Sequence, residues 1–414
     1  MIYKLLRLLI LLLFLAACTS AEPLATRTVN DEDEPEVELL PTATGTASIV
    51  IDDPPPTMEP PPSPTPQPTT TPILTPVPTT NMIDADDTRL QYNGRFDFQY
   101  PKAPAFDWSA TAIEFNFFGT SLTILLQDGR NSYNVIIDDR QQVLKTEMGV
   151  EEYLVAENLE PGVHHASLFK RTEAYVGAAE FMGLIISGGD LEPPPLVPER
   201  LIEFIGDSIT TGYGNEGDSP NCWFTPETQN ADQTYAAMTA RDLDAGYTLV
   251  ALSGLGVIRN LRAESEALAE TAVDFVDRAL GLNPFVIWPA DQRVPDAVVI
   301  NLGTNDYSSV PFPEDEEFIT AYMQLLDVIR ARYPEATIFA VAGPLMLGPA
   351  SRVIETAVER FQINNKDDRL QFVLVENNLD SSAEDLGCDF HPNVHGHRKI
   401  ADQLIPVIAE RMGW

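Results

Sequence analysis

The first regular pattern along the chain is an alternation of apolar and polar residues between positions 90 and 187. Residues 113–117 alternate in this way, and so do residues 122–124, with turn residues at 118–121 between them. A period of two predicts half-buried strands, and short strands at this spacing are typical of antiparallel folds. We therefore expect residues 83–190 to form an all-β domain of the sandwich or jelly-roll kind.

After Pro198 the pattern changes to short continuous apolar runs separated by stretches with a helical period. Such runs are typical of strands that are buried on both faces. Alternating strands and helices predict a parallel sheet covered by helices, an α/β domain over residues 199–414 that begins after the proline-rich boundary at 192–198. The expected strands are 201–205, 247–252, 296–302, 336–342 and 370–375, and the expected helical stretches are 230–245, 259–281, 314–332, 351–366 and 396–412.

Neither pattern is present in residues 18–82. This segment is rich in Pro, Thr, Glu and Asp, and Thr-Pro steps recur up to Thr80. Because such a composition cannot bury an apolar core, we expect a disordered, extended stalk.

Residues 1–17 are expected to be a signal peptide. Lys4 and Arg7 precede an apolar run at 8–15, and Leu-Ala-Ala stands directly before Cys18. The run is shorter than the ~20 residues that span a bilayer and is typical of a secretory signal. The Leu-Ala-Ala-Cys sequence resembles the lipobox of bacterial lipoproteins, which implies a lipid on Cys18 and an extracytoplasmic, membrane-anchored protein, at the cell surface or on the periplasmic face. An ordinary signal peptide that contains a cysteine is the alternative.

The chain is strongly acidic. It has 62 acidic and 26 basic residues, which gives a net charge of −36. A nucleic-acid partner requires a basic surface, so this class of partner is excluded. We interpret the acidic charge as a solubility feature.

Residues suited to acyl transfer follow the predicted strands. Ser208 follows the first strand, Gly254 the second and Asn305 the third, while His391 lies beyond the fifth. In open parallel sheets, reactive groups gather beyond the carboxyl ends of the strands. A serine nucleophile needs an adjacent base, and the tetrahedral intermediate needs hydrogen-bond donors for its oxyanion.

The same segments resemble the sequence blocks of SGNH/GDSL hydrolases. The blocks are Phe-Ile-Gly-Asp-Ser-Ile-Thr at 204–210, Ser253-Gly254, Gly-Thr-Asn-Asp at 303–306 and His391-Pro392. The resemblance implies a flavodoxin-like, five-stranded parallel sheet with Ser208 as nucleophile and His391 as base. It also implies an oxyanion hole formed by the backbone N–H of Ser208 with Gly254 and Asn305. Such a mechanism needs no metal or cofactor.

Within that superfamily the chain is most similar to carbohydrate esterase family 2. Most SGNH enzymes place the acid that orients the histidine three residues before it, where this chain has Cys388, whereas Asp389 stands two before. This variant at 387–394 resembles the family, whose members carry an N-terminal jelly roll. The β-rich region here, with Gly-Thr-Ser-Leu at 119–122 and Lys-Arg-Thr-Glu at 170–173, resembles that module. The resemblance implies that either the Asp389 side chain or a backbone carbonyl orients His391.

The loop after the first predicted strand holds further candidates. Tyr213 and Trp223 are expected to line a sugar-binding cleft, with core packing as the alternative. Cys222 lies in this loop and Cys388 lies just before the expected base. If nucleophile and base meet in space, an oxidising compartment permits these two cysteines to pair, and two free thiols are the alternative.

Three histidines close together raise the alternative of a metal site. His391, His395 and His397 lie within seven residues, but no glutamate accompanies them in the arrangement of the helical zinc motif. We therefore expect no metal.

The expected function is removal of O-acetyl groups from polysaccharides through an acetyl-serine intermediate. The family resemblance implies substrates of the xylan or mannan type. One alternative is a GDSL lipase or lysophospholipase that prefers long acyl chains. The other is a catalytically silent surface lipoprotein that binds glycans.

Overall fold

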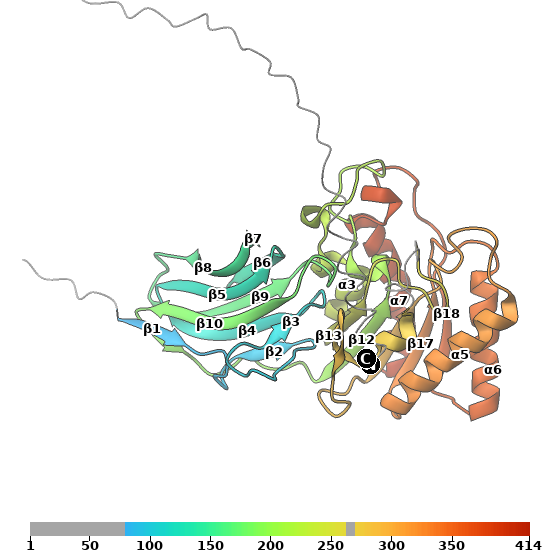
Figure 1. The fold of residues 1–414 in the computed structure, drawn as a ribbon, viewed down its shortest axis with the longest axis horizontal. Coiled ribbons are helices and arrows are strands. Elements are labelled where there is room, and N and C mark those ends of the chain that lie inside the picture. The colour runs from blue at the N-terminus through green and yellow to red at the C-terminus, as the bar shows by residue number, and fades with distance from the viewer. Residues whose placement is uncertain (1–78, 262–269) are drawn as a thin grey trace, which may run out of the picture. The chain divides into compact units, whose positions relative to one another are not determined.

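The computed structural model describes residues 79–261 and 270–414 (Figure 1). The predicted signal peptide, the lipidation of Cys18 and nearly all of the predicted stalk lie outside the described residues. Among the helices in these two ranges, none is long and apolar enough to cross a membrane.

Two antiparallel sheets form the first folded part of the chain, which we call the β module (residues 80–191). One sheet has the order β1-β10-β5-β8, with β3 paired to β10, and the other has the order β11-β4-β9-β6-β7, with β2 paired to β4. The strands are β1 (Thr80–Ile83), β2 (Gln91–Asn93), β3 (Ala105–Phe106), β4 (Ala112–Gly119), β5 (Ser121–Gly129), β6 (Ser132–Ile137), β7 (Arg140–Lys145), β8 (Met148–Ala156), β9 (Gly162–Lys170), β10 (Ala179–Ser187) and β11 (Asp190–Leu191).

The apolar residues of the predicted alternating strands form the core of the β module. Phe115 and Phe117 on β4 are fully buried together with Leu122 and Ile124 on β5. Strand β1 begins inside the segment that we expected to be stalk, because Ile83 packs into this core and residues 80–83 pair with β10.

The second folded part contains a parallel sheet of five strands in the order β13-β12-β16-β17-β18. Each strand corresponds to one of the five predicted apolar runs. The strands are β12 (Arg200–Gly206), β13 (Ala245–Ala251), β16 (Ala297–Asn301), β17 (Thr337–Ala342) and β18 (Leu370–Leu374).

Helices cover both faces of this sheet (Figure 1). Phe204 of β12 packs in a cluster with α3 and α7, whereas the next residue, Ile205, packs in a cluster with α5 and α6. Successive strand residues point to opposite faces, so a continuous apolar strand serves both layers. The helices are α2 (Ser208–Thr211), α3 (Tyr235–Asp242), α4 (Ala272–Phe275), α5 (Asp315–Arg332), α6 (Ala350–Asn365) and α7 (Val394–Met412), with 3₁₀ turns η1 (Pro226–Thr228), η2 (Ala231–Gln233) and η4 (Cys388–Phe390).

The predicted helix at 259–281 is wrong for its described residues. Only one helical turn, α4, forms there, and it is followed by a hairpin of β14 (Arg278–Leu280) and β15 (Asn283–Ile287). The apolar residues at helical spacing have another role here, because Phe275 and Val276 anchor an irregular segment in the core. The guanidinium carbon of Arg278 lies 4.2 Å from the centre of the Phe275 ring.

A buried ion pair joins the β module to the α/β domain. Arg95 Nη2 lies 2.9 Å from Glu203 Oε2, and both side chains are almost fully buried. Burying two charges costs desolvation free energy, so further hydrogen bonds are needed to offset it. Arg95 Nη1 supplies them by donating to the carbonyls of Val276 and Arg278 at 2.7 and 2.8 Å.

Candidate active site

Ser208 and His391 meet at the carboxyl edge of the parallel sheet. Ser208 begins helix α2 directly after β12, and its Oγ lies 2.8 Å from Nε2 of His391 although 183 positions separate the two residues. Asp207 fixes the start of the helix, because its Oδ1 accepts the N–H of Ile209 at 3.0 Å. The strand end and the cap therefore hold the hydroxyl in place for proton transfer to the imidazole.

The other imidazole nitrogen contacts the main chain. Nδ1 of His391 lies 3.0 Å from the carbonyl oxygen of Asp389. A carbonyl oxygen only accepts hydrogen bonds, so this contact favours the tautomer with the proton on Nδ1. Nε2 is then free to accept the Ser208 proton.

The Asp389 carboxylate has other partners. Its Oδ2 accepts the hydroxyl of Tyr213 and the backbone N–H of Phe224, each at 3.0 Å. Of the two predicted alternatives, the structure therefore favours orientation of His391 by the Asp389 carbonyl over orientation by its carboxylate.

An unusual turn aims that carbonyl. Asp389 and Phe390 have φ values of 52° and 59°, a region that costs free energy for residues other than glycine. The turn is held by hydrogen bonds from their N–H groups to the carbonyls of Cys222 and Pro220, at 2.9 and 3.2 Å. A disulfide joins Cys222 to Cys388, so these two cysteines are not free thiols.

The predicted oxyanion donors lie on the neighbouring strand ends. Gly254 has a φ of 83°, a conformation that glycine adopts without steric cost. Asn305 is 5% exposed, and its Nδ2 donates to the carbonyl of Leu255 at 2.8 Å and lies 3.3 Å from Asp207 Oδ2. Burial raises the pKa of Asp207 to about 7. Asn305 thus links the loop after β13 to the turn that carries the nucleophile.

The two aromatic candidates have different environments. The ring of Tyr213 stacks on Phe224 at 4.0 Å and lies 4.5 Å from the ring of His391, so Tyr213 packs against the imidazole. Trp223 is 80% exposed and belongs to the same loop. Tyr213 packs against the histidine, and Trp223 presents an exposed aromatic ring on the same loop.

Burial lowers the pKa of His391, while hydrogen bonding to the Asp389 carbonyl and the Asp389 charge act in the opposite direction. The imidazole is therefore neutral at neutral pH. A general base must be unprotonated to accept a proton, so His391 is in the state that the chemistry requires.

The three clustered histidines have three different partners. His391 contacts Ser208, His395 Nδ1 lies 2.6 Å from Asp385, and His397 is buried with its Nδ1 accepting the N–H of Tyr235. Within residues 79–261 and 270–414, no group of three or more His, Cys, Asp or Glu side chains is arranged to hold a metal ion.

Sequence reasoning missed two buried carboxylates that bind the loop after β13. Glu173 of the β module accepts two hydrogen bonds from Ser253. Asp306 accepts the N–H groups of residues 257–259. A signal for Glu173 was present, because the charged run at 170–173 directly follows an apolar strand.

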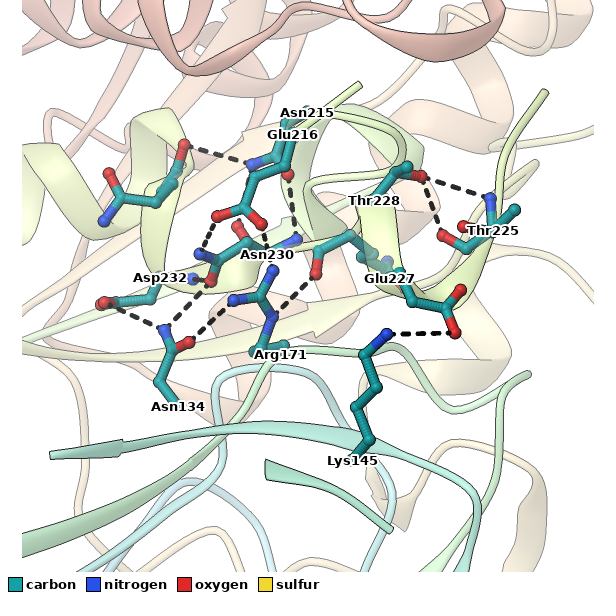
Figure 2. Close-up of polar contacts among 12 residues, drawn as sticks. Asn134, Lys145, Arg171, Asn215, Glu216, Thr225, Glu227, Thr228, Asn230 and Asp232 are labelled. Atoms are coloured by element: carbon teal, nitrogen blue, oxygen red, sulfur yellow. Dashed lines mark hydrogen bonds and ion pairs between the residues drawn. The ribbon is translucent and has the colours of Figure 1, made fainter. Parts of the chain in front are cut away.

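Arg171, from the same charged run, binds the loop after α2 (Figure 2). Its guanidinium pairs with Glu216 and donates to Asn134 Oδ1 at 2.9 Å and to the carbonyl of Gln229 at 3.2 Å. Asn230 donates to the second carboxylate oxygen of Glu216 at 2.6 Å. The β module therefore holds the loop that carries Tyr213 and Cys222.

Comparisons with known proteins agree with this geometry. The family model for the N-terminal region of carbohydrate esterase 2 matches residues 92–195, and the model for the GDSL-like lipase/acylhydrolase family matches residues 204–399. The chain is 36% identical to the cellulase/esterase CelE of Acetivibrio thermocellus over 336 residues, which are 80% of this chain but only 40% of that longer protein.

Two further relatives match over most of their length. An acetylxylan esterase / glucomannan deacetylase of Cellvibrio japonicus is 28% identical over 81% of this chain and 95% of its own. The structure of a family two carbohydrate esterase from Clostridium thermocellum in complex with cellohexaose is 35% identical, with a TM-score of 0.72 over 78% of this chain and 99% of that chain. With the same two-part fold and the Ser208–His391 pair at the strand ends, the chain belongs to carbohydrate esterase family 2.

Proposed function

We propose that this protein removes O-acetyl groups from polysaccharides of the xylan or mannan type by acyl transfer through Ser208. The observation that carries the proposal is the 2.8 Å contact between Ser208 Oγ and His391 Nε2, with Gly254 and Asn305 on the adjacent strand ends. The relatives named for acetylxylan and glucomannan support the substrate class.

In the first step, Ser208 Oγ attacks the carbonyl carbon of the acetyl ester while its proton passes to His391 Nε2. The carbonyl of Asp389 accepts the Nδ1–H of the imidazolium that forms. When the tetrahedral intermediate collapses, the bond between acetyl carbon and sugar oxygen breaks, and His391 gives the proton to this leaving oxygen, which becomes a hydroxyl group. The product is a deacetylated sugar and an acetyl-serine.

In the second step, water attacks the acetyl-serine and gives its proton to His391. Collapse of the second intermediate releases acetate, and the proton returns to Ser208. The kinetics are therefore of the ping-pong type.

The oxyanion of both intermediates is bound by the backbone N–H groups of Ser208 and Gly254 and by the amide of Asn305. One N–H of Asn305 is held at 2.8 Å by Leu255, whereas the contact with Asp207 is longer at 3.3 Å. The N–H with the longer contact is the one available to the oxyanion. Preorganised donors of this kind stabilise the transition state because they need no reorganisation during the reaction.

The test is a substrate profile with the purified protein. We expect acetate release from acetylated xylan and acetylated glucomannan, and p-nitrophenyl acetate to be cleaved faster than p-nitrophenyl octanoate. Preference for the octanoate would favour the lipase alternative. Glycan binding without any release of acetate would favour the silent binding protein.

We also propose that residues 1–17 direct export and that Cys18 carries a lipid, so the enzyme works outside the cytoplasm on a membrane. The disulfide between Cys222 and Cys388 supports an oxidising compartment. In a bacterial host, labelled palmitate should be incorporated into the wild-type protein and not into Cys18→Ser. Equal labelling of both proteins would refute the anchor.

A further inference from the structure

We propose that Glu173 of the β module is a positioning residue of the esterase active site, which fixes the loop that carries the oxyanion donor Gly254. This inference rests on the proposed function. It assigns the β module a part in the chemical step.

Glu173 uses both carboxylate oxygens on one residue of that loop. It lies between β9 and β10 and is 2% exposed. Its Oε2 accepts the backbone N–H of Ser253 at 2.7 Å, and its Oε1 accepts the Ser253 hydroxyl at 2.6 Å. Two charge-assisted hydrogen bonds to the residue directly before Gly254 fix both the position and the orientation of the backbone there.

Glu173 is itself held in place. Lys170 Nζ, fully buried, donates to the carbonyls of Thr172 and Glu173 at 2.7 and 3.3 Å. The backbone N–H of Glu173 donates to Gln229 Oε1 at 3.2 Å, and Gln229 Nε2 donates to the carbonyl of Thr211 at 3.3 Å. Thr211 is the last residue of α2, the helix that Ser208 begins, so Glu173 connects the Gly254 loop with the nucleophile helix.

The opposite end of the Gly254 loop is clamped by a second carboxylate. Asp306 accepts the N–H groups of Val257, Ile258 and Arg259 at 2.8–3.1 Å. Gly254 therefore lies between two buried anchors, one from each folded part of the chain. Oxyanion stabilisation depends on donors that are already in position, so losing one anchor should reduce the rate of the chemical step more than substrate binding.

The chain offers a matched control for this interface. Asp107 of the β module is also 2% exposed and also accepts two backbone N–H groups from the α/β domain, those of Gly281 and Leu282 at 2.8 and 3.1 Å. The segment that it binds carries none of the catalytic groups. Asp107→Ala therefore reports the structural cost of losing such a contact.

The experiment compares full-length Glu173→Ala, Glu173→Gln, Ser253→Ala and Asp107→Ala by thermal unfolding and by kcat and KM for p-nitrophenyl acetate. For Glu173→Ala we expect kcat to fall about tenfold to hundredfold with KM changed less than about threefold. For Ser253→Ala, which deletes one of the two bonds and leaves the β module intact, we expect a fall in kcat of about threefold to tenfold. Asp107→Ala should lower thermal stability and leave kcat of the folded enzyme unchanged.

Glu173→Gln should restore kcat to within about threefold of wild type. Its amide oxygen accepts the Ser253 N–H, and its amide nitrogen donates to Ser253 Oγ, whose proton turns to Thr211 Oγ1 at 3.4 Å. A wild-type kcat in Glu173→Ala, or an equal loss of kcat in Asp107→Ala, would overturn the inference. If Glu173→Ala does not fold, an unchanged kcat in Ser253→Ala overturns it. Absence of esterase activity in the wild type would instead refute the proposed function.

Discussion

Nδ1 of His391 is hydrogen-bonded to the backbone carbonyl of Asp389 at 3.0 Å, and not to a carboxylate. In a Ser-His-Asp triad the acid both selects the imidazole tautomer and stabilises the imidazolium through its charge. A carbonyl selects the same tautomer but offers only a dipole. The position of that dipole is then decisive, which explains why the turn before His391 is tied down by hydrogen bonds and a disulfide.

The Asp389 side chain should therefore be of limited importance for catalysis. We expect Asp389→Asn to lower kcat for p-nitrophenyl acetate by less than about tenfold, in contrast to the ~10⁴-fold loss when a triad aspartate is replaced by asparagine. Asparagine is the appropriate change because it tolerates the positive φ of this position. A loss of about 10³-fold or more would assign the orienting role to the carboxylate.

The pH dependence should follow from the lowered pKa of His391. Activity requires the neutral imidazole, and a pKa below the ordinary 6.5 keeps it neutral at more acidic pH. The acidic limb of kcat/KM should therefore have its midpoint below pH 6.5. The charge of Asp389 raises the pKa of His391, so Asp389→Asn should move this midpoint to still lower pH. A midpoint above 6.5, or a shift to higher pH in the variant, would contradict this account.

The sequence predicted those parts of the fold and the site that depend on the type of side chain at each position. Continuous apolar runs predicted all five parallel strands, and Ser208, Gly254, Asn305 and His391 stand where the strand ends are expected to meet. The group that orients His391 could not be read from side chains, because it is a backbone carbonyl and every residue has one. The backbone turn at Asp389 decides which carbonyl reaches the imidazole.

Two other features were beyond sequence reasoning for physical reasons. The segment after residue 270 has apolar residues at helical spacing, yet these residues anchor a short turn and a hairpin. A turn and a hairpin can bury apolar residues at this spacing without forming a helix. The charged run that contains Glu173 was visible, but its role was missed because its partner, Ser253, lies 80 positions away on the other folded part. Such contacts depend on tertiary packing and not on local spacing.

Reduction of the disulfide should impair both stability and turnover. Cys222→Ser/Cys388→Ser removes a cross-link over 166 positions, and losing a native disulfide costs about 2–5 kcal/mol of stability in small secreted domains. Because the bridge also holds the turn that aims the Asp389 carbonyl, we expect kcat to fall more than KM rises. Dithiothreitol should reproduce this effect in the wild type and have no effect on the double variant. Unchanged melting temperature and kcat after reduction would refute this role.

Trp223 should contribute to polysaccharide binding. Its exposed indole, on the loop that also carries Tyr213, can stack on a sugar ring, a contribution of about 1 kcal/mol. We expect Trp223→Ala to raise KM for acetylated xylan about fivefold to tenfold and to affect p-nitrophenyl acetate much less. Phe285→Ala, which removes another highly exposed ring, from the β14–β15 hairpin, is the control. Equal KM values for acetylated xylan in wild type and Trp223→Ala would exclude stacking.

The most direct test of the account is acetate release by Ser208→Ala compared with wild type, on both p-nitrophenyl acetate and acetylated xylan. Ser381→Ala, at an exposed serine, serves as the control. We predict that Ser208→Ala folds with a wild-type circular dichroism spectrum and loses at least about 10³-fold in kcat on both substrates, because the acyl-enzyme forms on the Ser208 hydroxyl. Acetate release by Ser208→Ala at the wild-type rate would contradict the account.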